Sequence, residues 1–473
     1  MTATKPLSVG QEALWFLHRM APDSSAYNVA AAVRIRTALD IGILRKALAA
    51  TAERHDMLRS TFVEEPAGPR RAVGTADMPS LTVHDVGVVA DDELRAVVRS
   101  LSTVPLDLTR AAFRAELVQR ADDDAVLLLT AHHIATDAYS QGIVLRDLLD
   151  AYGAGGSMTA EPLQLTWDDH VAAEAALLDS PRRDELEAYW RNVCTRVPRV
   201  LELPTDRPRP ARQTFEGDTH ELRLPEEFVA RLRAAAFGAG VTPFVLLMAA
   251  FQSTLHRWTG QDDFLVGWPT TTRSGRRTRD LVGYFVNSLA LRVHFEPSTT
   301  FADLFRALDE QIKNGVSHVA YPFALLPKAI GLPHDPSRPP ITQVAATMVT
   351  TNRLDPFADL LAAGEAAGRE LVAGGLRVSA FDLPQQEGQC DLSIEFLQST
   401  ASLRISFRYH TQLFERSAIE RFARHFQKYA EAAVDNVDAR VAAVSTVTTD
   451  DWAQLLALGS GATSALGSQG GVS

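Results

Sequence analysis

The chain has 473 residues, of which 46% are hydrophobic and 22% charged, and its formal net charge is −11. This composition is typical of a globular protein with a substantial core, and the length predicts two or three domains. The acidic balance argues against nucleic acid as the main partner, because phosphate binding needs clustered Lys and Arg.

The cysteines and the apolar runs point to the cytoplasm. Cys194 and Cys390 lie far apart and outside any C-x-x-C motif, which excludes a disulfide framework and a structural zinc site. The longest strongly apolar run, residues 244–251, is far shorter than the ~20 residues that span a bilayer. Residues 1–6 lack the apolar segment of a signal peptide. We therefore expect a cytoplasmic protein that does not enter a membrane.

Three helices are marked by capping residues at their starts. A side-chain oxygen just before an apolar stripe of helical spacing can accept the free N–H groups of a first turn. The third helix is apolar on all sides over residues 244–251, so it should be buried. The signals are Ser8 with Gln11, Asp40 before a stripe that runs toward residue 54, and Thr242 with Pro243.

Short apolar runs between the helices predict strands at residues 125–131, 264–266 and 285–295. Strands mixed with helices and hairpin-like stretches indicate an α/β fold with mixed sheets. A composition shift over residues 153–210, with Gly at one end and Pro at the other, marks a join between two lobes. We place the lobes at residues 1–175 and 176–450, and a flexible tail at residues 451–473.

The segment His-His-Ile-Ala-Thr-Asp at residues 132–137 is the most informative about chemistry. It follows a predicted strand and precedes a helical stripe, a place where α/β proteins often carry reactive side chains. A metal site is disfavoured, because adjacent residues on a strand point to opposite faces and cannot easily share one ion. Two interpretations stay open from spacing alone. Either both histidines satisfy backbone groups while Asp137 caps the helix, or one histidine is a general base.

This segment matches the HHxxxD signature of the condensation domains of nonribosomal peptide synthetases, and further motifs of that family follow its order. An HxxxD alone is weak, whereas an ordered set is specific. The other matches are Ser8-x-x-Gln11-x-x-Leu14-Trp15, residues 54–62 (RHDMLRSTF), Trp167-Asp168-Asp169 in place of Y-x-D, residues 203–210 (LPTDRPRP), residues 282–288 (VGYFVNS) and residues 335–338 (DPSR).

The resemblance implies two lobes like chloramphenicol acetyltransferase, arranged in a V with a central tunnel. Donor and acceptor would enter from opposite faces on phosphopantetheine arms and meet at His133, the implied catalytic residue. His132 would turn into the fold, and Asp137 would pair with Arg273 from the second lobe. Candidate substrate contacts at matching motif positions are Ala138, Ser140, Asn287 and Tyr321, although packing or a turn explains Asn287 equally well.

The chain departs from the family pattern at two places. Ala138 replaces the usual Gly after the motif Asp, which would cost room or strain if the backbone there needed φ > 0. The family's HQDYPFE is HVAYPFA at residues 318–324, which puts a standard aminoacyl-carrier acceptor in doubt. The double His argues against the heterocyclising branch. No adenylation domain follows, so we interpret the chain as a free-standing condensation enzyme.

The expected reaction is acyl transfer from a peptidyl carrier protein thioester to an amine or hydroxyl, which forms an amide or an ester. The acceptor is carrier-bound or a free small molecule, the enzyme binds no cofactor or metal of its own, and we expect a monomer. One alternative is a coenzyme A-dependent acyltransferase that shares the HxxxD motif. The other is a non-catalytic module that recruits carrier proteins.

Overall fold

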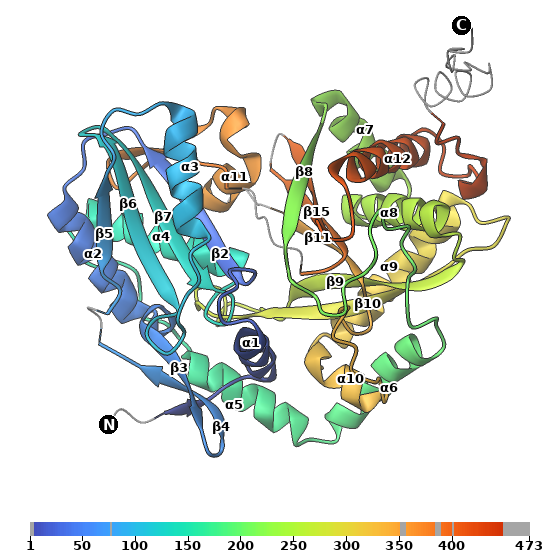
Figure 1. Ribbon diagram of the computed structural model, residues 1–473, viewed down its shortest axis with the longest axis horizontal. Coiled ribbons are helices and arrows are strands. Elements are labelled where there is room, and N and C mark those ends of the chain that lie inside the picture. Colours follow the sequence, from blue (N-terminus) through green and yellow to red (C-terminus); the bar gives the residue numbers. More distant parts are fainter. Residues whose placement is uncertain (1–3, 76–77, 351–355, 384–388, 400–401, 448–473) are drawn as a thin grey trace, which may run out of the picture.

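The computed structural model describes residues 4–75, 78–350, 356–383, 389–399 and 402–447, and it has two lobes that open as a V (Figure 1). Each lobe contains one six-stranded mixed sheet. The order is β12-β13-β2-β7-β6-β5 in the first lobe and β10-β9-β11-β14-β15-β8 in the second. The predicted tail at residues 451–473 lies outside the described residues.

The sheet of the first lobe is covered on both faces, as the sequence of its central strand requires. In β7, Leu127 and Leu129 pack on the side of α2 and α4, whereas Val126 and Leu128 pack with α3. The elements are α1 (Val9–Met20), β2 (Asn28–Ile35), α2 (Ile41–Arg54), β5 (Leu81–Asp85), α3 (Asp91–Ser102), β6 (Phe113–Ala121), β7 (Asp124–His132) and α4 (Ala138–Gly153).

The second lobe is built around the helix α8, whose residues 244–255 are all buried, as its apolar sequence predicts. It packs against α12 and α9 (Figure 1) within one core cluster. The elements are β8 (Gly217–Leu224), α7 (Glu226–Gly238), α8 (Pro243–Thr259), β9 (Asp263–Thr271), β10 (Val286–His294), α9 (Phe301–Ser317), α10 (Leu326–Ala329), β11 (Val344–Thr350), β14 (Leu392–Gln398), β15 (Leu403–His410) and α12 (Arg416–Asp435).

No single described helix has the length and hydropathy of a membrane span. Helices α7 and α8 reach that threshold only when taken together, and they are bent by 101° relative to each other.

Helices α5 (Trp167–Leu178) and α6 (Arg182–Thr195) connect the lobes along the base of the V (Figure 1). They lie in the region predicted as a join. The structure also has a second connection between the lobes, which was not predicted. It is formed by α11 (Pro356–Ala363), β12 (Glu370–Ala373) and β13 (Leu376–Ala380), which return to the first lobe. There β13 pairs antiparallel with β2, with Val378 opposite Ile35. Chain position alone therefore does not divide the lobes: residues 370–380 fall within the range predicted for the second lobe, yet they extend the first sheet.

The capping predictions are confirmed. Ser8 and Gln11 form a capping box on α1, Asp40 caps α2, and Thr242 caps α8 with Pro243 in its first turn. Strand β9 is longer than predicted, because it continues through Pro269, which lies opposite Ser288 of β10.

The RHDMLRSTF motif at residues 54–62 has an architectural role. Arg54 and His55 both contact Asp147 of α4, at 2.9 and 2.8 Å. Asp56 lies 3.0 Å from the guanidinium of Arg71, which is buried in β4 (Gly68–Val73), and Asp168 of α5 accepts a 2.7 Å hydrogen bond from the same group.

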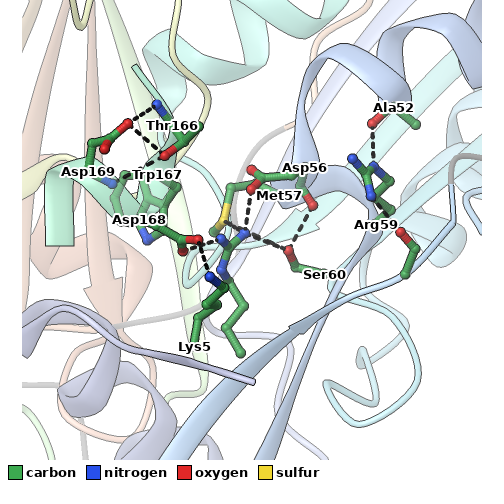
Figure 2. Close-up of polar contacts among 12 residues, drawn as sticks. Lys5, Ala52, Asp56, Met57, Arg59, Ser60, Thr166, Trp167, Asp168 and Asp169 are labelled. Atoms are coloured by element: carbon green, nitrogen blue, oxygen red, sulfur yellow. Dashed lines mark hydrogen bonds and ion pairs between the residues drawn. The ribbon is translucent and has the colours of Figure 1, made fainter. Parts of the chain in front are cut away.

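Figure 2 shows how Lys5, Asp56, Ser60 and Asp168 gather here from separate elements. The elements are β1 (Lys5–Pro6), the turn after α2, β3 (Ser60–Glu65) and α5. A buried cation is tolerated only when it is paired, so this cluster fixes the start of the connecting helix on the first lobe.

Candidate active site

His133 lies in a tight turn between the end of β7 and the start of α4. Its backbone N–H donates to the carbonyl of Tyr27 at 2.7 Å, which ties the turn to the neighbouring chain before β2. Its ring Nδ1 lies 2.7 Å from the carbonyl oxygen of Thr136. A carbonyl oxygen can only accept, so Nδ1 carries the proton and Nε2 is left with a lone pair. The turn therefore selects the tautomer that can accept a proton.

The surroundings keep this imidazole neutral. Burial lowers the pKa of His133 below its ordinary value, against the opposing effects of the Thr136 carbonyl and the Asp137 charge. The ring of Tyr284 stands at 88° to the imidazole, with 5.1 Å between centroids. Among the described residues, Nε2 has no hydrogen-bond partner. The arrangement suits a general base that acts on a group brought to it.

We predict that the neutral form of His133 sets the acid limb of the pH–rate profile. A lowered pKa means that the active form persists as the solution becomes mildly acidic, and that activity falls only as pH drops through that lowered pKa. The limb of kcat/KM should therefore lie below the usual histidine value of about 6.5. The profile is best measured with a hydroxyl acceptor, because an amine titrates itself. A limb at or above the usual value contradicts the assignment.

His132 points away from this position. It is 3% exposed, and its Nδ1 accepts the N–H of Ile134 at 3.1 Å. Burial and the neighbouring His18 and His133 lower its pKa to about 3, so it stays neutral. His132 therefore supports the turn, in agreement with opposite orientations for adjacent residues at a strand end.

Asp137 fixes the site to the second lobe. One oxygen accepts the N–H of Ser140 at 2.6 Å, which caps α4, and the other accepts the N–H of Phe285 at 3.2 Å. The guanidinium of Arg273 lies 3.4 Å from the same carboxylate, and both side chains are under 10% exposed. Asp137 therefore organises the turn that presents His133, and its own oxygens are occupied.

Arg273 and Phe285 belong to the loop between β9 and β10, residues 272–285, which we call the crossing loop. It extends from the second lobe into the core of the first, where Leu281, Val282 and Phe285 pack with first-lobe residues. Arg273 donates to the carbonyls of Thr278 and Leu281 at 2.7 and 2.6 Å, and its guanidinium stacks 4.0 Å above the ring of Phe285. One arginine thus shapes the loop and pairs with the HHxxxD aspartate.

Ser140 and Trp167 hold the crossing loop from the first lobe. The Ser140 hydroxyl donates to the Gly283 carbonyl at 3.0 Å and accepts from Arg273 at 2.9 Å, so its hydrogen bonds are made within the protein. The fully buried Trp167 ring covers Gly283. Its indole N–H donates to Gln11 at 3.0 Å, and Gln11 donates to the Ile134 carbonyl at 2.8 Å. Two family motifs therefore brace the HHxxxD turn.

Gly283→Ala should destabilise the protein by about 1–3 kcal/mol or more, through overpacking. A Cβ at this position would lie 2.0 Å from Cζ3 of Trp167, which is closer than atoms can approach. Urea unfolding measures the effect, and Gly142→Ala in α4 is the control, because a Cβ there meets no atom within 4 Å. Equal stability of the two variants would show that Trp167 yields and that the loop is not held in this way.

The other predicted substrate contacts have different surroundings. Ala138 is exposed and is the first residue of α4. It is not among the described residues with positive φ, so alanine fits without strain. Asn287 donates to the carbonyls of Val319 and Tyr321, both at 2.7 Å, and its oxygen accepts the N–H of Phe323 at 2.9 Å. The Tyr321 hydroxyl donates to Glu187 at 3.1 Å. Asn287 and Tyr321 thus hold the 319–323 segment in place. This is the packing role that the sequence left open for Asn287.

Tyr27, Tyr284 and Gln11 are the site residues that the sequence reasoning missed. Tyr284 occupies a variable position inside the VGYFVNS motif, and Gln11 was predicted as a capping residue and a motif match but not as a contact of the HHxxxD turn. No spacing signal places either beside the HHxxxD turn. As to metal ligation, the described residues include no group of three or more His, Cys, Asp or Glu side chains that could hold an ion.

Comparison with known proteins decides the family. A model of the condensation domain matches residues 1–456. The chain belongs to the condensation-domain family. One of the linear gramicidin synthase proteins of Brevibacillus parabrevis is 31% identical over 461 residues, which are 95% of this chain and 6% of that protein. The phosphinothricin tripeptide synthetase PhsC of Streptomyces viridochromogenes is 31% identical over 454 residues, 94% of this chain and 40% of that one.

This condensation domain thus spans less than half of either relative.

Solved structures share its fold. A four-domain nonribosomal peptide synthetase bound to AMP and glycine superposes with a TM-score of 0.85 at 23% identity, over 94% of this chain and 34% of that chain. The X-domain in its complex with OxyB from teicoplanin biosynthesis gives 0.82 at 26% identity, over 95% and 97%. The lobes therefore have the chloramphenicol acetyltransferase-like fold, and condensation domains of this family form amide bonds.

Proposed function

We propose that this condensation domain transfers an acyl or aminoacyl group from the thioester of a peptidyl carrier protein to an amine or a hydroxyl. The observation that carries the proposal is the Nε2 of His133, which is neutral, unpaired among the described residues, and placed where the crossing loop joins the two lobes. The donor thioester is already activated. The protein mainly has to position two reactants and take one proton.

In the proposed step the acceptor nitrogen or oxygen adds to the thioester carbonyl while its proton passes to Nε2 of His133. The tetrahedral intermediate then collapses and the C–S bond breaks, and the His133 imidazolium returns its proton to the carrier thiolate that leaves. The Thr136 carbonyl on Nδ1 stabilises the imidazolium that forms in between. Asp137 contributes by holding the turn and by its charge, which favours the protonated ring.

A coenzyme A-dependent acyltransferase is the nearest alternative, because it would use the same histidine chemistry. The two are separated by assaying one acyl group on two thiols, the phosphopantetheine of a carrier protein and coenzyme A. We expect product with the carrier-bound donor and much slower turnover with acyl-CoA. A higher kcat/KM with acyl-CoA would overturn the carrier-dependent proposal.

A recruitment role is the second candidate, and the likeness to an X-domain seen in complex with OxyB favours considering it. Retention of His133 and Asp137 in bonded, ordered positions favours catalysis instead.

The altered segment at residues 318–324 favours a free acceptor over a carrier-bound one. Supplying one amine free and on a carrier tests this choice. Cytoplasmic location and a monomeric state stay predictions.

A further inference from the structure

We propose that Phe215 is a water-excluding residue of the active site, which closes the junction of the lobes beside the catalytic turn and suppresses hydrolysis of the donor thioester. This inference rests on the proposed function. Phe215 belongs to the chain that enters β8 of the second lobe, and its ring lies against Tyr27 of the first, with 6.1 Å between centroids and an angle of 69°.

The backbone of Phe215 is strained. Its φ is +64°, and Ile341 is the other described non-glycine residue with positive φ. An L-residue with a Cβ is disfavoured there, and a bulky one is rare, so the conformation persists only where the surroundings impose it. Strained residues of this kind gather at functional sites.

The contacts that force the positive φ of Phe215 are made by residues on both sides of it in the chain. The N–H of Gln213 donates to the carbonyl of Pro336 at 2.9 Å, and the carbonyl of Glu216 accepts from the N–H of Thr411 at 3.0 Å. Both contacts are with the second lobe, so the chain must turn between them. The turn aims the aromatic ring at the first lobe, and glycine at this position would leave the gap open.

The ring lines a small cavity on the side of the catalytic turn where His132 lies. Phe215, Tyr27, His18 and His132 line this cavity together with parts of α1, and it has no room for a water molecule. Tyr27 connects the cavity to the catalytic residue, because its carbonyl accepts the N–H of His133 at 2.7 Å. Beside it, Gln389 of the second lobe donates to the carbonyl of Ala26 at 2.6 Å, which seals the same junction.

Water exclusion matters for this reaction because the donor has two possible fates. If an amine or hydroxyl attacks the thioester carbonyl, the product is an amide or an ester and the free carrier thiol. If water attacks, the C–S bond breaks to give the free acid and the same thiol. A base that accepts a proton from the acceptor can also accept one from water, so the site gains selectivity by keeping water out.

The test measures how the donor partitions. Donor-loaded carrier protein is incubated with acceptor, and the ratio of free acid to condensed product is measured for the wild type, Phe215→Ala and Phe215→Leu. Phe237→Ala is the matched control, since Phe237 in α7 is 88% exposed. We expect Phe215→Ala to raise the ratio about tenfold. Phe215→Leu, which keeps an apolar side chain, and Phe237→Ala should stay near the wild type.

Thermal unfolding checks the strain separately. Phe215→Ala and Phe215→Gly both lack the ring, but only glycine accepts a positive φ freely, so its Tm should be higher by about 2 °C. Equal Tm values would show that the strain is absent.

If the wild type condenses but Phe215→Ala partitions like Phe237→Ala, the water-exclusion role is wrong while the proposed function stands. If the wild type forms no condensed product, the proposed function itself is wrong.

Discussion

Replacing His133 with alanine should lower the rate of ester formation by about 10²- to 10⁴-fold, the usual contribution of a positioned general base. Amide formation should fall less. A neutral amine is a good nucleophile and loses its proton easily once it has attacked. A neutral hydroxyl is a poor nucleophile, so it depends on the base to take its proton as it attacks. The measurement is the single-turnover rate with one donor and a matched amine and alcohol.

His84→Ala is the control for this experiment. His84 lies on β5, is partly exposed, and pairs with Glu116 at 3.2 Å, away from the HHxxxD turn. Its replacement should leave both rates unchanged. His133→Ala should also keep the Tm close to that of the wild type, since the ring donates a single described hydrogen bond, to Thr136. Equal, near-wild-type rates for both acceptors in the His133 variant would refute the base role.

Asp137→Ala should cost about 3–5 kcal/mol of unfolding free energy, the usual loss when one member of a buried ion pair is removed. The substitution leaves the guanidinium of Arg273 without its carboxylate in a site where both side chains are under 10% exposed. It also removes the acceptor for the N–H groups of Ser140 and Phe285. The crossing loop should therefore loosen, and the activity should fall with it.

Two further variants make this prediction sharp. Asp137→Asn keeps an oxygen for the cap but loses the charge, so its stability should lie between the wild type and Asp137→Ala. Asp303→Ala removes an exposed aspartate from the start of α9, where its partner Arg306 is 76% exposed, and should cost about 1 kcal/mol or less. Urea unfolding midpoints report the differences. The crossing-loop account is wrong if Asp137→Ala is no more destabilising than Asp303→Ala.

Local signals predicted the helices well because capping depends on residues within one turn. Ser8 with Gln11 and Thr242 with Pro243 start α1 and α8 as expected. The HHxxxD turn was also found from sequence, since its chemistry is contiguous. The pairing of Asp137 with Arg273, 136 residues apart, came only from the family resemblance.

Long-range features gave no such signal. Nothing in residues 370–380 indicates that they pair with β2 rather than with the neighbouring second-lobe strands, because strand pairing is set by tertiary packing. The dual use of Gln11, as a cap and as a brace of the Ile134 carbonyl, likewise depends on a contact across 123 residues. The positive φ of Phe215 is set by its neighbours in the second lobe and opposes its own preference.

The most direct test of the account is to observe the His133 ring while a donor analogue is bound. A hydrolysis-resistant analogue, with an amide in place of the thioester on phosphopantetheine, is added to protein carrying ¹⁵N-labelled histidine, and His133→Gln assigns the resonance. The account predicts a neutral ring protonated on Nδ1, whose Nε2 signal shifts on binding while that of His132 changes little. Saturable binding that leaves the His133 Nε2 signal unmoved would contradict it.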